Sequence, residues 1–298
     1  MKRVFLFLIT NLAIVFVLAV ALRVFGLEWL LFQYGIDFWP LLAFSFIFGM
    51  GGAFISLRIS KWTAKRWMGL TVIDEPRNNT EIWLVNTVQN YARAANIAMP
   101  EVAVYDSPEP NAFATGPSRN NSLVAVSTGL LRAMKPDQAS AVLGHEVSHV
   151  ANGDMVTLTL LQGVLNTFVI FLSRVIGYVV DRALHRDGEG GYGMGYFVTV
   201  IVTQILLGIL ASIVVSWYSR RREYRADAGG AYLAGRGNMI GALEALQRSV
   251  EPEHMPEQLE AMGIAGVRKG GLRMLFASHP PMEDRIAALR EERHAAGT

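Results

Sequence analysis

The segment His145–His149 reads His-Glu-Val-Ser-His, a pattern that can build a hydrolytic metal site. If the segment is helical, His145 and His149 lie four residues apart on one face, where both imidazoles can reach one zinc ion. Glu146 then lies beside the metal as a candidate general base. The alternative is a buried helix whose histidines only satisfy hydrogen bonds. With 6 histidines in 298 residues the complete spacing rarely arises by chance, so we favour a zinc hydrolase.

The flanking residues favour a helix at this motif. Pro136 suits a first turn because it lacks an N–H that would be unbonded there, and Asp137 complements the positive end of the helix. Ala139, Ala141, Val142 and Leu143 continue without a helix breaker, and Asn152-Gly153 is a plausible helix end. We therefore expect both histidines on one helix.

A catalytic zinc site needs a third protein ligand and leaves a fourth position for water. A third histidine at HExxHxxGxxH spacing is absent, because positions 152 and 155 hold Asn and Met. A glutamate from a later helix is the other solution, and Glu223 has the best setting. Asp227 follows it four residues later, so on a helix one carboxylate can bind the metal while the other orients a ligand histidine. The alternative is a solvated helix with charge pairs.

Four motifs together resemble those of the HtpX-type membrane zinc metalloproteases, bacterial relatives of the CAAX prenyl endopeptidases. They are NAFATG at 111–116, HEVSH at 145–149, SRRREYRAD at 219–227 and SHPPMEDRI at 278–286. The resemblance covers nearly the whole chain and implies that His145, His149 and Glu223 bind one zinc ion per chain. It also implies that Glu146 is the catalytic base and that Asp227 supports the ligands from behind. The implied activity is cleavage of misfolded or damaged membrane proteins.

Two of these motifs supply candidates for contacts with the substrate. By the resemblance, Asn111, Ala112 and Phe113 are candidates for a sheet edge that holds the substrate backbone as an added strand. A plain strand in the core is the alternative. His279 is a candidate hydrogen-bond donor to the oxyanion of a tetrahedral intermediate, and Arg285 is a weaker candidate for the same task.

The composition independently indicates a membrane protein. The chain is 52% hydrophobic, and its mean hydropathy is +0.30. A membrane-spanning helix needs about 20 apolar residues, and four segments are long enough. The first is longer than the apolar core of a signal peptide, so we expect it to be retained. The four segments are Val4–Leu22, Phe38–Leu57, Leu158–Val180 and Tyr196–Tyr218.

The distribution of basic residues predicts the orientation. Lysine and arginine flank the cytoplasmic ends of membrane helices, and the loop Val24–Asp37 contains neither. Both termini and the protease domain are therefore expected in the cytoplasm, below the inner membrane of a bacterium. Two of the predicted spans separate His149 from Glu223. An even number of membrane crossings returns the chain to the same side, so both residues can reach one metal ion. The predicted parts are membrane hairpins at 1–60 and 155–218 and protease segments at 61–154 and 219–298.

The expected fold class is an α-helical membrane protein with four transmembrane helices and a mainly α (α+β) cytoplasmic domain of the gluzincin type. A helical period over 80–97 and short apolar runs at 102–105 and 123–127 predict a helix beside a small sheet. Residues 251–272 have the composition of a mobile cover or of a long connection, and the sequence does not decide between them.

Several classes of partner and function are disfavoured. The chain has no cysteine and a net charge of only +2, with basic residues gathered near the apolar segments, which favours lipid headgroups over nucleic acid. A phosphate-binding glycine motif is missing, so no nucleotide is expected. The expected partners are unfolded or membrane protein substrates and the bilayer. The alternatives are a non-catalytic zinc-binding membrane scaffold, a metal transporter and a prenyl-peptide protease. A transporter is disfavoured because Gln162, Asn166 and Gln204 provide no carboxylate or histidine for a cation.

Overall fold

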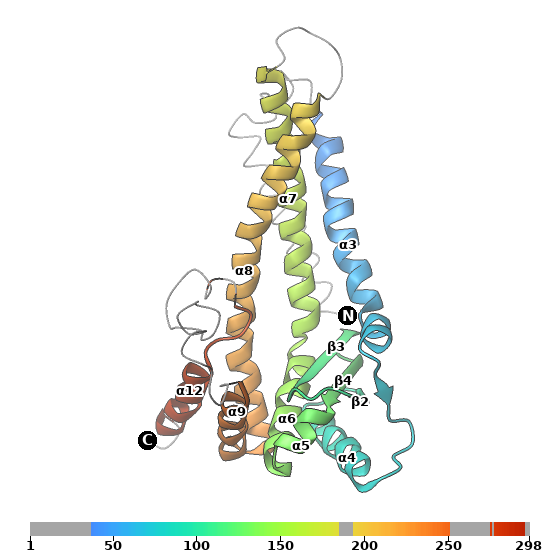
Figure 1. The fold of residues 1–298 in the computed structure, drawn as a ribbon, viewed down its shortest axis with the longest axis vertical. Helices are drawn as coiled ribbons and strands as arrows, with labels where there is room; N and C mark the ends of the chain where they lie inside the picture. Colours follow the sequence, from blue (N-terminus) through green and yellow to red (C-terminus); the bar gives the residue numbers. More distant parts are fainter. Residues whose placement is uncertain (1–36, 185–192, 251–274, 276, 296–298) are drawn as a thin grey trace, which may run out of the picture. The chain divides into compact units, whose positions relative to one another are not determined.

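The computed structural model describes residues 37–184, 193–250, 275 and 277–295 (Figure 1). These residues belong to two compact units. One comprises the described parts of Met1–Ser56 and Val156–Val215, and the other those of Leu57–Met155 and Ser216–Thr298. The predicted segments Val4–Leu22 and 251–272 lie outside the described residues, so the total of four spans stays a prediction.

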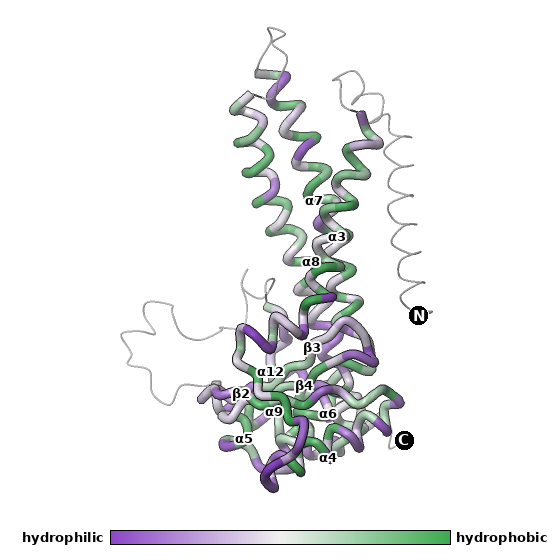
Figure 2. The backbone as a smooth tube through the Cα atoms, turned by 90° about the vertical axis from the view of Figure 1, so that its right-hand side faces the viewer, coloured by the Kyte–Doolittle hydropathy of each residue, from purple (hydrophilic) through white to green (hydrophobic). Residues whose placement is uncertain are grey.

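Three helices of the described chain are long and apolar enough to cross a membrane. Figure 2 shows apolar residues along much of each. Each contains one predicted span, and the charged residues lie mainly toward the helix ends, as expected for helices in contact with lipid. These helices are α3 (Phe38–Trp67), α7 (Asp154–Leu184) and α8 (Met194–Ala234).

Helices α3 and α7 approach closely where small residues face the partner helix. A Cβ atom on Gly49 would lie 2.5 Å from Thr167 Oγ1, so a larger residue would separate the helices. Arg174, which the sequence places within a span, has its guanidinium 4.8 Å from the ring centre of Phe44. It also donates a hydrogen bond of 3.1 Å to the Ile170 carbonyl. These contacts partly compensate its charge.

The second unit contains a four-stranded sheet with the order β1-β2-β4-β3. Strands β2 and β4 are parallel, whereas β1 with β2 and β3 with β4 are antiparallel. The two predicted strands correspond to β2 and β4, and β3 is an edge strand. The bounds are Thr71–Val72 for β1, Glu101–Tyr105 for β2, Ala112–Ser118 for β3 and Asn121–Ser127 for β4.

The helix that carries HEVSH begins and ends where the sequence predicts. Pro136 occupies its first turn, and Gly153 ends it with a left-handed φ of 72°, a conformation that glycine adopts without strain. The helix predicted over 80–97 is observed at nearly the same place. The helices of this unit are α4 (Asn79–Ala94), α5 (Thr128–Ala133), α6 (Pro136–Asn152), α9 (Arg236–Val250) and α12 (Met282–Ala295).

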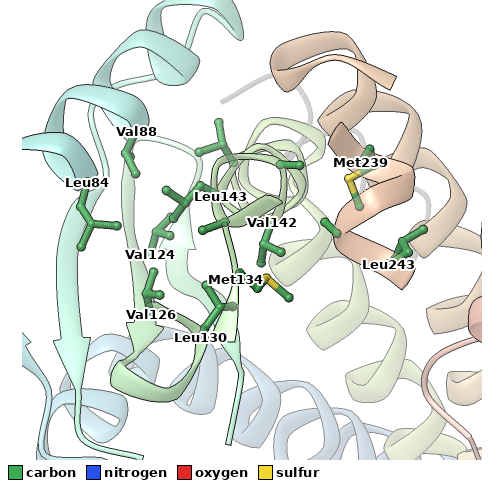
Figure 3. Packing of buried hydrophobic residues seen from close by; sticks show 14 of the residues in the cluster. Leu84, Val88, Val124, Val126, Leu130, Met134, Val142, Leu143, Met239 and Leu243 are labelled. Carbon is green, nitrogen blue, oxygen red and sulfur yellow. The ribbon is translucent and has the colours of Figure 1, made fainter. Parts of the chain in front are cut away.

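Helix α6 is the centre of the hydrophobic core (Figure 3). Its side chains Val142 and Leu143 are buried among residues from the sheet and from helices on other sides. Because close-packed interiors resist displacement, this packing fixes the position and rotation of the helix that carries the two histidines. The surrounding core residues include Leu84 and Val88 of α4, Val124 and Val126 of β4, and Met239 and Leu243 of α9.

Candidate metal centre

His145 and His149 on α6 and Glu223 on α8 come together in the interior of the second unit, which comprises the described parts of Leu57–Met155 and Ser216–Thr298. All three are buried, and one potential ligand atom from each lies within 4.8 Å of the others. The two Nε2 atoms are 3.1 Å apart, and each lies 3.4 Å from a carboxylate oxygen of Glu223. Tetrahedral zinc with bonds of about 2.0–2.1 Å separates its ligand atoms by about 3.3 Å. The three groups therefore fit a metal ion of this kind.

Close packing between α6 and α8 brings Glu223 to the histidines. The helices touch at Gly144 and Gly230, where a Cβ atom on either glycine would lie 3.0–3.4 Å from the backbone of the other helix. At Gly229 a Cβ atom would lie 2.4 Å from Ser148 Oγ. The pair Gly229 and Gly230 thus allows α8 to lie directly against the histidine helix. These glycines follow Glu223 by six and seven residues, about two helical turns.

The second ring nitrogen of each histidine is held by a carboxylate. His145 Nδ1 is 2.9 Å from Asp227 Oδ1, and His149 Nδ1 is 2.8 Å from Asp154 Oδ2. A carboxylate at Nδ1 holds the proton on that nitrogen and leaves the lone pair on Nε2 for a metal. Both lone pairs then face one point beside Glu223, an arrangement that a cation stabilises.

The two oxygens of the Glu223 carboxylate have different surroundings. Glu223 is fully buried, and within the described part of the chain its Oε1 has no close hydrogen-bond donor, only contacts of 3.4 Å to His149 Nε2 and 3.6 Å to Arg222 Nε. Its Oε2 accepts a hydrogen bond of 2.9 Å from His279 Nδ1. A buried carboxylate oxygen without a donor is costly unless a cation or solvent satisfies it, and a metal ligand is such a case.

The electrostatics of the metal-free site show how strongly these groups are coupled. Burial alone would lower the pKa of His149, but hydrogen bonds to Asp154 and Glu223 outweigh burial and raise the pKa to about 9. The pKa of His145 is likewise raised, because Asp227 and Glu223 outweigh its burial. Burial would raise the pKa of Glu223, and the neighbouring histidines instead hold it well below its usual range. Without a metal, both histidines therefore hold a proton more tightly than a free imidazole does.

The two transition-state candidates both lie next to the three converging groups. Arg285 is buried and forms a two-pronged pair with Asp227, with distances of 2.7 and 2.6 Å. Its Nη2 lies 3.8 Å from Glu223 Oε2. His279 has a side chain that is 58% exposed, and its Nδ1 is the atom that faces Glu223. Arg285 thus uses its main hydrogen bonds on Asp227. His279 faces Glu223 with Nδ1, which leaves Nε2 as the nitrogen that could contact a bound molecule.

Glu146 and the candidate substrate edge lie on neighbouring elements. Glu146 lies between the two histidines on α6 and is 9% exposed, and α6 packs against β3. Ala112 and Phe113 are the first residues of β3, and the carbonyl of Asn111 just before them accepts a hydrogen bond of 2.9 Å from Ser127 N. Among the residues that the structure describes, the candidate edge therefore belongs to a strand with one side paired and the other unpaired.

The family model described as Peptidase family M48 matches residues 78–293, which is more than half of the chain and includes all the groups above. The chain belongs to peptidase family M48. Several curated proteases are similar over their full length. Protease HtpX of Alkalilimnicola ehrlichii is 59% identical over 302 residues, covering 100% of both chains. Protease HtpX homolog of Nitrosomonas europaea is 58% identical, covering 97% of this chain and 99% of its own.

The resemblance to HtpX-type proteases is thereby confirmed, and this M48 chain is a membrane metalloprotease. The crystal structure of S. mikatae Ste24p has a similar fold, with a TM-score of 0.58 at 18% identity. The match covers 95% of this chain and 66% of that one, so the M48 chain shares its fold with most of a longer protein.

Sequence reasoning did not identify Asp154 or the role of Arg285 as the partner of Asp227. Asp154 follows His149 by five residues and directly follows a glycine, which is a signal for a turn that folds back on the helix end. The pairing of Arg285 with Asp227 joins residues 58 positions apart, and local spacing carries no information about it.

Proposed function

We propose that this membrane metalloprotease is a zinc-dependent endopeptidase and that His145, His149 and Glu223 hold one zinc ion per chain. The observation that carries the proposal is the convergence of two imidazole nitrogens and the Glu223 carboxylate: the nitrogens are 3.1 Å apart, and each lies 3.4 Å from one of the two carboxylate oxygens. Zinc is favoured over harder cations because nitrogen and carboxylate ligands in tetrahedral arrangement suit it, whereas magnesium and calcium prefer oxygen alone.

The proposed mechanism assigns one task to each group. Bound zinc supplies Lewis acidity and lowers the pKa of water to about 7. Glu146 takes the proton of the attacking water and delivers it to the leaving amine. His279 donates a hydrogen bond to the developing oxyanion through the ring nitrogen that does not face Glu223. Asp227, fixed by Arg285, holds the His145 ring in the orientation that ligation requires.

The proposed substrates are unfolded segments of misfolded or damaged membrane proteins. An edge strand presents unpaired N–H and C=O groups, which bind any extended backbone with little regard to sequence. Strand β3 has such an edge, and its first residues Ala112 and Phe113, with Asn111 before them, are the proposed contact. A folded domain does not offer an extended backbone, so selection for unfolded protein follows from the mode of binding.

We further propose that the chain lies in the inner membrane of a bacterium with the protease domain in the cytoplasm. Basic residues follow the apolar stretches of α3 and α8, and the loop Val24–Asp37 has none. Positive residues near membrane helices remain on the cytoplasmic side, which places the protease residues after these stretches in that compartment.

The test compares detergent-purified wild type with Glu146→Gln, prepared with a chelator and then given zinc. We expect about one zinc per chain in both proteins and cleavage of an unfolded protein such as casein by the wild type alone, with a loss of at least about 100-fold in the variant. Cleavage by the variant at the wild-type rate would contradict the role of Glu146. Zinc in both proteins without cleavage by either would favour the non-catalytic scaffold.

A further inference from the structure

Asp154 is a buried carboxylate at the point where α6 passes into α7. Its exposed fraction is 1%, and its two oxygens have different partners. Oδ2 lies 2.8 Å from His149 Nδ1, and Oδ1 lies 3.3 Å from Nη2 of Arg225 on α8. Burying a carboxylate is unfavourable unless charged or donating groups compensate it, so Asp154 depends on these two partners.

The local backbone explains how a residue so near in sequence can face the histidine. Helix α6 ends at Asn152, Gly153 adopts a left-handed conformation with φ 72°, and α7 begins at Asp154. The reversal at Gly153 directs the first residue of α7 toward the last turn of α6, where His149 lies. A residue with a Cβ atom at Gly153 would be strained in this conformation, so the glycine and the aspartate act together.

The same arrangement occurs at the other histidine. His145 contacts Asp227, and Asp227 contacts Arg285, just as His149 contacts Asp154, and Asp154 contacts Arg225. The two His–Asp–Arg sets differ in how exposed the arginine is. The side chain of Arg285 is 5% exposed, whereas that of Arg225 is 59% exposed. Solvent screening weakens the outer ion pair, so Asp154 depends less on its arginine than Asp227 does.

We infer that Asp154 is a positioning residue for the proposed metal centre: it orients the His149 ring for ligation, and Arg225 braces it. The inference rests on the proposed function, because it assumes that His149 binds zinc. It adds that the first turn of α7, a candidate membrane helix, contributes a group that the metal site needs. Partners that hold a ligand histidine typically change metal affinity by about 10–100-fold when removed.

The experiment measures zinc affinity by competition with a fluorescent chelator, on the full chain in detergent. All proteins carry Glu146→Gln, so that self-cleavage cannot interfere. In this parent, Asp154→Asn keeps a hydrogen-bond acceptor without the charge, whereas Asp154→Leu keeps neither. We expect the dissociation constant for zinc to rise about 10-fold in the first and about 100-fold in the second. Arg225→Met should raise it about threefold, as for a largely exposed ion pair.

Matched controls separate positioning from general damage. Asp137→Asn removes an exposed carboxylate from the other end of α6, and Arg93→Met removes an exposed arginine from α4, so neither should change zinc affinity. Thermal unfolding of each metal-free protein reports loss of stability separately. Unchanged zinc affinity in both Asp154 variants would overturn the inference, even if they unfold earlier. Failure of the parent to bind zinc would instead overturn the proposed function.

Discussion

At the scale of single residues, the protein's central feature is a set of buried groups that cannot all be satisfied by one another. Two histidine nitrogens and the Glu223 carboxylate face one point, while other carboxylates contact the second nitrogen of each histidine. In the metal-free chain, Asp154 and Glu223 outweigh the effect of burial and raise the pKa of His149 to about 9, so a proton on this histidine compensates part of their negative charge. A metal ion must displace this proton before it can bind.

This competition predicts that zinc affinity depends on pH. The folded pKa of His149 is raised from 6.5 to about 9, so its proton stabilises the metal-free chain fully below pH 6.5, and this stabilisation is lost as the pH rises through about 9. Zinc affinity should therefore increase across the same window, by about tenfold per pH unit for each proton displaced, and level off above it.

Chelator competition at several pH values, corrected for the titration of the competitor, measures this dependence. An affinity that stays constant across the window would show that the histidine is not protonated in the metal-free chain, and would contradict our description of its surroundings.

At the scale of elements, the site depends on how closely α8 can lie against α6. Gly230→Ala should lower stability by about 1–3 kcal/mol, as for overpacking of a core. Its Cβ atom would lie 2.9 Å from Met239 Sδ and 3.0 Å from His145 N. We also expect weaker zinc binding, because a shift of α8 moves Glu223 with it.

The matched control is Gly237→Ala on α9, where a Cβ atom meets nothing within 4 Å. That exchange should raise stability by up to about 1 kcal/mol, since alanine favours helix over glycine. Thermal unfolding, monitored by circular dichroism, compares the stability of Gly230→Ala with that of Gly237→Ala. Equal midpoints for the two variants would show that the glycine contact does not set the distance between the helices.

The helices and strands themselves were largely predictable from the sequence, whereas the contacts between side chains of different helices were not. The limits of α6 follow from Pro136 and Gly153, and strands β2 and β4 follow from short apolar runs, because these signals are local. Residues of the NAFATG motif lie on the outer strand β3 of the described sheet, and their contact with substrate stays a prediction. In contrast, the pairing of Arg285 with Asp227 arises from packing between α12 and α8, which no local pattern encodes. The contact of Asp154 with His149 depends on the left-handed conformation of Gly153. The sequence predicted only that the helix ends near this glycine, and not that the next residue faces the histidine.

At the scale of the whole molecule, the chain combines apolar helices with a protease unit formed by residues before α7 and after the apolar part of α8. The two parts of this unit can meet because two candidate spans, in α7 and α8, separate them in sequence. Two membrane crossings would return the chain to the side it left. The predicted first span, Val4–Leu22, lies outside the described residues, so the orientation depends on the basic residues alone.

The orientation is testable because the chain has no cysteine. Asp37→Cys places a thiol just before α3, and Arg93→Cys places one on α4 of the protease unit. A maleimide that cannot cross membranes should label the first in intact spheroplasts and the second only after the inner membrane is permeabilised. Labelling in the reverse order would contradict the cytoplasmic location of the protease unit.

The measurement that tests the central claim most directly is zinc-edge X-ray absorption on purified Glu146→Gln, with Glu146→Gln/Glu223→Gln beside it. We predict a spectrum with two imidazole ligands and oxygen ligands at about 2.0–2.1 Å, and loss of bound zinc in the double variant under the same chelator. A spectrum without two imidazoles, or one that is unchanged by the loss of the Glu223 carboxylate, would contradict the assignment of His145, His149 and Glu223 as the metal ligands.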